Sequence, residues 1–172
     1  RSRASYGAGT KTGPSTVTDV AVGPEQTWTI VDSKRSKTFT YDFDGNLLFA
    51  FGNEGTMLGN VSNIQSICYQ GDVLMVLSAL TNTITTYKRT EYGDLLIVAL
   101  KHDNERKYDM TIDDWTEILK RNNNFDAAYI QIGKALYRQG KYEEAMEMYK
   151  YAYDTTNYSE AWQQVRKEWT EK

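Results

Sequence analysis

The spacing of apolar side chains along the chain changes near residue 100. Before that point, short segments alternate apolar and polar positions, and turns rich in Gly, Asp and Asn separate them. Alternation with a period of two is typical of strands that bury one face. After that point, apolar residues recur three and four positions apart, as on a helix with one buried face. The pattern predicts an α+β chain with the strands first and the helices second.

The strand region contains the same order of segments twice. Asp32 aligns with Ser78 and Tyr41 with Tyr87, 46 residues apart, and the spacing becomes 48 at Gly45 and Gly93. Self-similarity at such a spacing is typical of repeat proteins, whose units pack on their neighbours. We expect two four-stranded antiparallel units that superimpose strand for strand, with no helix in residues 28–51 or 73–100. The predicted strands lie near 17–22, 28–32, 37–42 and 46–51, and near 64–69, 73–78, 83–88 and 94–100.

The helical region is predicted to contain four helices. Thr111 and Asp114 are spaced as in a capping box, which predicts that a helix begins there and ends at residues 122–124. A helix pair at 125–139 and 142–154 is expected to be broken at Gly140, and a last helix to cover 159–171. The predicted organisation is therefore a flexible arm (1–16), two β units (17–100), a polar linker (101–110) and a helical domain (111–172).

Residues 19–52, DVAVGPEQTWTIVDSKRSKTFTYDFDGNLLFAFG, resemble an NHL repeat, which is one four-stranded blade of a β-propeller. The second repeat keeps the strand order but has Leu77-Ser78-Ala79 where the family has V-D-S, and it lacks the D-x-D-G turn. The resemblance implies a propeller of about six blades that binds proteins, RNA or small molecules on one rim. Two blades cannot close such a ring, so the chain is expected to be a piece of a longer protein.

Residues 126–159 resemble one tetratricopeptide (TPR) unit. The matching positions are Tyr129, Ile132, Gly133, Leu136, Tyr142, Ala145, Tyr149 and Ala152. In that family the first helix of each pair faces a peptide-binding groove. The resemblance therefore places Ile130, Lys134, Tyr137 and Arg138 in a groove that could hold a peptide carboxylate. A solvated face, or a face docked onto the blades, is the alternative.

The order of the two repeat types points to a further resemblance. NHL blades followed by TPR helices resemble the soluble part of bacterial envelope proteins that continue into a Yip-family membrane domain. The segment YSEAWQQVRKEW is similar to the part that precedes the membrane helices there. The resemblance implies that any membrane association comes from a part of the full-length protein outside this chain.

Charge and the scarcity of reactive residues narrow the function. Residues 1–100 carry 8 basic and 9 acidic side chains and residues 101–172 carry 12 and 14, so neither half predicts a nucleic-acid partner. The single cysteine, Cys68, lies in an apolar strand pattern and is expected to be a buried structural thiol. The single histidine, His102, falls in the polar linker. No catalytic residue, metal site or cofactor is predicted.

One calcium-like motif has a simpler interpretation. The run Asp42-Phe43-Asp44-Gly45-Asn46 resembles the start of an EF-hand loop, but Asn53 stands where the last ligand, Glu, is required. A hairpin turn is favoured instead.

The sequence predicts a non-catalytic protein-interaction or scaffolding segment that binds a protein or peptide. The alternative is a fragment of a lactonase- or lyase-like propeller enzyme whose catalytic blades are missing. Because a blade is apolar on both faces, two stacked blades leave two faces uncovered. Trp115 and Ile118 are predicted to cover one face. The other, with Tyr41 and either Trp28 or Ile30, is predicted to pair with another copy of the chain.

Overall fold

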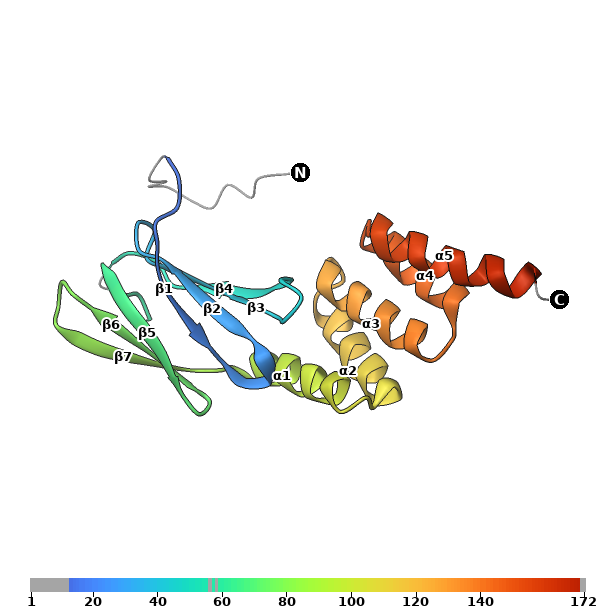
Figure 1. Ribbon diagram of the computed structural model, residues 1–172. Helices are drawn as coiled ribbons and strands as arrows, with labels where there is room; N and C mark the ends of the chain where they lie inside the picture. The colour runs from blue at the N-terminus through green and yellow to red at the C-terminus, as the bar shows by residue number, and fades with distance from the viewer. Residues whose placement is uncertain (1–12, 56, 58, 171–172) are drawn as a thin grey trace. The chain divides into compact units, whose positions relative to one another are not determined.

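The computed structural model describes residues 13–55, 57 and 59–170 and divides the chain into two compact units (Figure 1). The first unit covers residues 1–89 and contains strands, and the second covers residues 90–172 and contains helices. The predicted α+β class, with strands before helices, is therefore confirmed. The arm predicted over residues 1–16 lies mostly outside the described residues.

The strand unit consists of two antiparallel sheets in which consecutive strands are neighbours. The first has the order β1-β2-β3-β4 and the second the order β5-β6-β7. The bounds are β1 (Val17–Val22), β2 (Trp28–Asp32), β3 (Lys37–Tyr41), β4 (Leu47–Phe51), β5 (Ile64–Gln70), β6 (Val73–Ser78) and β7 (Thr83–Lys88). Short connections join the strands within each sheet, and Gly45 and Gly71 take positive φ in two of them, where a side chain would be strained.

The two sheets share their strand register. Trp28 pairs with Tyr41, and 46 positions later Leu74 pairs with Tyr87. The β1–β2 pairing also recurs in β5–β6, including the bulge after its first residue pair, with an offset of 47 in the first strand. The prediction that Tyr41 and Tyr87 occupy the same place in the third strand of each sheet is confirmed.

The prediction that the two units superimpose over four strands, with no helix in residues 73–100, is wrong. Residues 94–100 were expected to form the fourth strand of the second repeat, but they lie inside a helix, Glu91–Asn104. Thr90 caps this helix, with its side chain accepting a hydrogen bond from the Gly93 backbone N–H. Acidic residues in the first turn and basic residues in the last turn stabilise the helix by interacting favourably with its dipole. The repeat thus extends over three strands, and within the described residues β7 pairs only with β6.

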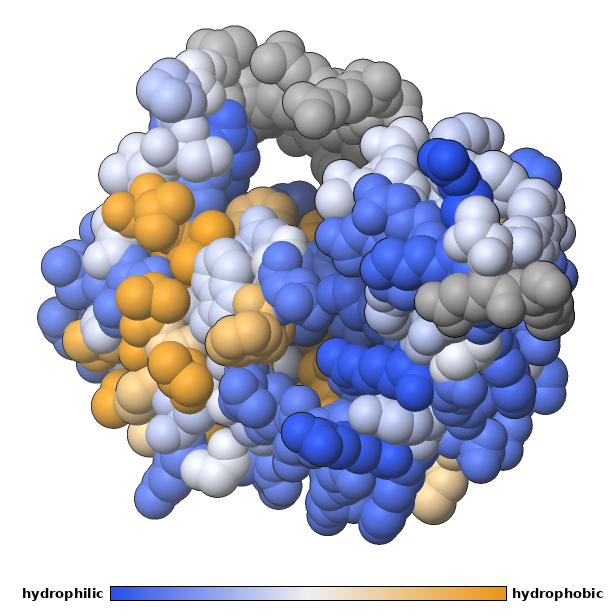
Figure 2. Space-filling view, turned by 45° about the vertical axis from the view of Figure 1, so that its right-hand side comes forward, coloured by the Kyte–Doolittle hydropathy of each residue, from blue (hydrophilic) through white to orange (hydrophobic). Residues whose placement is uncertain are grey.

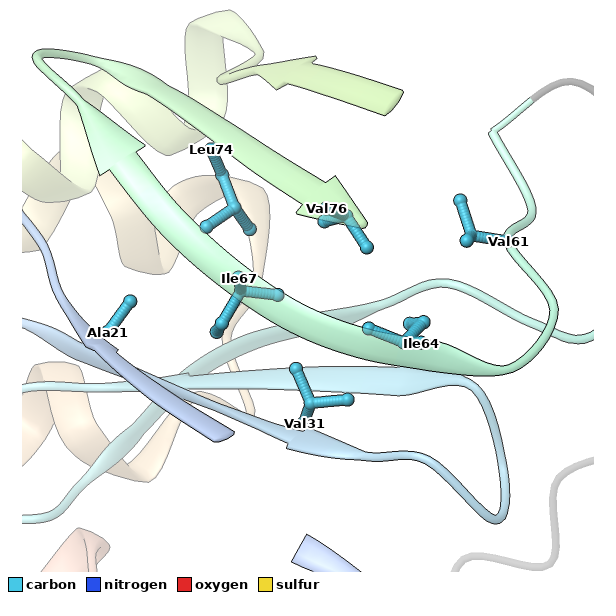
Figure 3. Close-up of a cluster of buried hydrophobic side chains, with 7 residues drawn as sticks. All are labelled: Ala21, Val31, Val61, Ile64, Ile67, Leu74 and Val76. Atoms are coloured by element: carbon cyan, nitrogen blue, oxygen red, sulfur yellow. The ribbon is translucent and has the colours of Figure 1, made fainter. Parts of the chain in front are cut away.

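The core of the strand unit lies between the two sheets (Figure 3). The first sheet contributes Ala21 and Val31, and the second sheet and the segment before it contribute Val61, Ile64, Ile67, Leu74 and Val76. We call the sheet faces that meet here the inner faces and the opposite ones the outer faces. One hydrogen bond between hydroxyl groups also joins the two inner faces, between Thr29 and Tyr69 at 2.8 Å.

The helical unit is a series of five helices in which each helix packs on the next. They are α1 (Glu91–Asn104), α2 (Tyr108–Arg121), α3 (Asp126–Arg138), α4 (Tyr142–Tyr151) and α5 (Thr155–Thr170). The linker predicted over residues 101–110 is wrong, since most of it belongs to α1 and α2. Thr111 does not cap a helix either. It is buried inside α2, where its hydroxyl donates to the Lys107 carbonyl at 3.1 Å.

The turn between α1 and α2 has the same geometry as the turn between α3 and α4. Lys107 donates its backbone N–H to the His102 carbonyl, and 34 positions later Lys141 donates to the Leu136 carbonyl. Arg106 and Gly140 both have positive φ at the corresponding place. The buried rings of Trp115 and Tyr149 are also 34 positions apart. The helical unit therefore contains two equivalent hairpins, of which only the second was expected from the sequence.

Candidate functional site

The outer face of the first sheet is apolar, and its residues on β1 are exposed among the described residues. Val17 and Val20 are each 57% exposed and Val22 is 75% exposed. The strand register places Ile30, Phe39 and the half-buried Trp28 and Tyr41 on the same face. Figure 2 shows apolar side chains gathered over the strand unit, on the left of that view. Contiguous apolar surface of this kind is typical of an interaction site.

Trp28 and Tyr41, both predicted as interface residues, form one rigid element of this face. Their rings stack at a centroid distance of 4.5 Å, and the two residues are cross-strand partners. The Trp28 indole N–H donates to the Asp42 carbonyl at 2.8 Å, which fixes the ring orientation. Asp42 in turn accepts two hydrogen bonds from Asn46, each at 2.8 Å, and closes the β3–β4 hairpin turn.

The outer face of the second sheet carries Met75, Leu77, Ile84 and Cys68. Leu77 is 40% and Ile84 is 65% exposed. Cys68 is exposed, so the prediction of a buried thiol is wrong. The strand pattern indicated that one face of β5 is buried, but Ile64 and Ile67 are the buried residues, and Cys68 lies on the opposite face.

Two carboxylates, Asp19 and Asp32, accept several hydrogen bonds in the strand unit. Asp19 accepts hydrogen bonds from the Ser66 hydroxyl at 2.6 Å and the Ile67 backbone N–H at 2.8 Å, and so ties β1 to β5. These hydrogen bonds, that of Ser66 foremost, lower the pKa of Asp19. Burial of Asp32 acts to raise its pKa, but hydrogen bonds from Arg35 and the Thr16 backbone N–H outweigh burial and lower it.

The four residues predicted for the peptide groove lie on α3 or at its end. Ile130, Lys134 and Tyr137 are half-buried, and the Tyr137 ring meets the Tyr142 ring edge-on at 5.1 Å. Arg138 is exposed but already engaged. Its guanidinium binds Asp103 of α1 at 2.8 Å and lies 5.8 Å from the centre of the Tyr108 ring. The groove itself stays a prediction.

Trp115 and Ile118, predicted to cover a sheet, are fully buried. The Trp115 ring packs against Phe125, in the same unit, at 6.2 Å. Its indole nitrogen has no hydrogen-bond partner among the described residues.

A shallow depression of about 330 Å³ lies where α1 turns into α2. It is lined by Arg106, Lys107, Tyr108, Asp109, Met110 and Gln139. The amide of Gln139 donates to the Asp109 carboxylate at 2.8 Å. Nearby, His102 pairs with Asp114 at 2.6 Å and joins α1 to α2, so this histidine lies in a helix and not in a linker.

The last helix carries aromatic rings on its surface. The rings of Trp162 and Trp169 meet edge-on at 5.6 Å, and the two side chains are 38% and 61% exposed. The sequence predicted these residues on one face with Val165. The structure buries Val165 together with Ala161 and leaves the two tryptophans outside.

The described residues contain neither a metal-binding cluster nor a membrane-spanning helix. Within the described part of the chain, no group of three or more His, Cys, Asp or Glu residues could hold a metal ion. None of the described helices is both long and apolar enough to cross a bilayer. No family model and no curated protein matches the chain.

Proposed function

We propose that this chain is a non-catalytic recognition or scaffolding segment of a larger protein and binds a protein or peptide through its helical unit. The strand unit is of the NHL type and the helical unit of the TPR type. The register offset of 46 between the sheets and the 34-position offset between the hairpins support this assignment. Repeats of this kind bury their cores against neighbours and present side chains on their outer surfaces for binding.

The observation that carries the proposal is the cluster of Lys134, Tyr137 and Arg138 on α3. Lys134 and Arg138 are one helical turn apart, so both cations lie on the same side of the helix. The edge-on contact with Tyr142 fixes the Tyr137 ring, and Asp103 orients the Arg138 guanidinium. Fixed side chains lose little conformational entropy on binding. Two cations with an aromatic ring beside them suit a peptide with an acidic side chain or a free C-terminal carboxylate.

Panning a random peptide-display library against the full chain tests this proposal. Peptides that end in a free carboxylate or are rich in Asp and Glu are expected to be enriched. Lys134→Glu is expected to reduce their binding by ten-fold or more, since a charge-assisted contact contributes roughly 1.5–3 kcal/mol. The matched control is Lys120→Glu on the exposed side of α2, which makes the same charge change elsewhere. Enriched peptides without acidic groups, or equal binding by the two variants, would refute the proposal.

A further inference from the structure

The two outer faces of the strand unit are counterparts of the two inner faces that already pack together. Most residues of the second sheet have an equivalent in the first, 46 or 47 positions earlier. The inner face of the second sheet therefore corresponds to the outer face of the first. By the same offset, the outer face of the second sheet corresponds to the inner face of the first.

The equivalent positions keep the apolar character of the existing core. Ile64, Ile67, Leu74 and Val76 correspond to Val17, Val20, Trp28 and Ile30 on the open face of the first sheet. On the other side of the contact, Ala21 and Val31 correspond to Cys68 and Leu77. Every strand position of the buried cluster thus has an apolar equivalent on an exposed face.

One pair of hydroxyl groups meets across the inner contact, and on the outer faces both of its equivalents are apolar. Tyr69 and Thr29 hydrogen-bond to each other at 2.8 Å. Their equivalents are Val22 and Met75, so a polar pair becomes an apolar pair. Had only one partner changed, the other hydroxyl would face an apolar side chain and lose its hydrogen bond on burial. The paired change makes the two outer faces complementary to each other.

We propose that a second copy of this chain binds here, with the outer face of its second sheet on the outer face of the first sheet. The contact repeats the packing between the two sheets within one chain. It joins two different surfaces, so it is heterologous, and each added copy leaves a new open face for the next. This self-association is separate from peptide binding by the helical unit and does not rest on it.

Two blocking variants of the full chain test the proposal. Val20→Lys blocks the first sheet's face and Leu77→Lys blocks the second sheet's face, and both positions are equivalents of buried core residues. The wild-type mass in light scattering is expected to rise with concentration from 19.7 kDa towards multiples of it. Each variant alone is expected to stay at 19.7 kDa, whereas an equimolar mixture should reach twice that mass and stop.

Cys68 reports which face is used, because its equivalent, Ala21, is buried in the core. In the mixture, iodoacetamide should modify Cys68 slowly in the Val20→Lys chain and at the monomer rate in the Leu77→Lys chain, and intact mass distinguishes the two. The control is Phe43→Lys, which adds the same charge at a 75% exposed position in the β3–β4 turn and should associate like the wild type. Val22→Lys replaces Val20→Lys if the latter does not fold by circular dichroism.

Three results would overturn the proposal. The wild type could stay at 19.7 kDa at its highest soluble concentration, which would mean that another part of the molecule covers the faces. The mixture of the two variants could fail to associate, which would indicate a contact between identical faces. Phe43→Lys could also abolish association, which would place the contact elsewhere.

Discussion

Asp32 ends β2 with its side chain almost completely buried and surrounded by donors. The backbone N–H groups of Thr16 and Lys34 donate to Oδ1, and Arg35 donates to Oδ2 at 2.7 Å. Its equivalent, Ser78, accepts from Thr81 and donates to the Ser62 carbonyl. Both residues therefore hold the chain segment that leads into their sheet, but only Asp32 does so with a charge.

The first prediction is that Asp32→Asn lowers the free energy of unfolding of the strand unit by about 1–3 kcal/mol at neutral pH. The folded-state pKa of Asp32 lies below its unfolded value. Its contribution is therefore fully present above the unfolded pKa, about 3.9, and is lost as the pH falls through the folded pKa.

The variant should consequently lose less stability than the wild type on acidification below about pH 4. Hydrogen exchange with mass spectrometry in denaturant measures the strand unit separately from the helices. Asp113→Asn, at an exposed position of α2, is the control and should leave the strand unit unchanged. Parallel pH profiles for wild type and Asp32→Asn would contradict the assignment.

Gly133 allows α3 and α4 to approach closely. A Cβ atom at this position would lie 2.5 Å from Cε1 of the Tyr149 ring, which is itself buried. Alanine favours a helix over glycine by about 1 kcal/mol. The second prediction is that Gly133→Ala nevertheless destabilises the helical unit by about 1–3 kcal/mol, because the buried ring cannot move away.

A double-mutant cycle isolates the contact. Tyr149→Leu alone should also destabilise, by leaving space in the core, but the double variant should cost less than the sum of the two. Thermal unfolding followed by far-ultraviolet circular dichroism measures all four proteins. Strict additivity, or a stabilising Gly133→Ala, would show that the close approach does not constrain this position.

At the scale of elements, α1 shows why a strand can be predicted where a helix forms. Residues 94–100 are apolar around most of the helix, so their pattern has neither a period of two nor a period of 3.6. A short apolar run of this kind does not distinguish a strand from a buried helix. The signals that do distinguish them lie at the ends: Thr90 as N-cap, Glu91 and Asp94 in the first turn, and Lys101 in the last.

The third prediction follows from that cap. Thr90→Ala removes the side chain that accepts from the Gly93 N–H at 3.3 Å, and it should destabilise the helical unit by about 1 kcal/mol. Thr116→Ala, at an exposed position inside α2, is the control and should be neutral or slightly stabilising. Thermal unfolding by circular dichroism compares the two. Equal effects would mean that Thr90 does not determine where α1 begins.

Alternation was sufficient to predict seven strands because most of them bury one face, and most of the turns between them carry Gly, Asp or Asn. It could not predict that the sheet of β5–β7 stops at three strands, since that depends on the competing helix. Nor could it assign Cys68 to a face, because a shift of one residue exchanges the two faces of a strand. The residues predicted for the groove lie on α3, where the resemblance predicted a helix, and the groove itself stays a prediction. The ion pair between Arg138 and Asp103 joins residues 35 positions apart and has no local signal.

At the scale of the whole molecule, both units are built by repeating a small element, and each element packs on its neighbour in sequence. Units of repeat proteins bury apolar faces against their neighbours. In the helical unit, α5 exposes the rings of Trp162 and Trp169. In the strand unit, the apolar residues of the two outer faces match each other position by position.

The last prediction is that stability of the strand unit depends on protein concentration. If copies associate through the outer faces, association stabilises the folded state by mass action, and each ten-fold increase in concentration adds up to about 1.4 kcal/mol. For a unit of this size, that corresponds to a rise in Tm of several degrees. Differential scanning calorimetry over a concentration series should show this rise for the wild type and for Phe43→Lys. Val20→Lys should unfold at one temperature throughout, because its first sheet cannot accept a second copy. A wild-type transition that is equally independent of concentration would mean that the outer faces do not bind each other, even though their residues match.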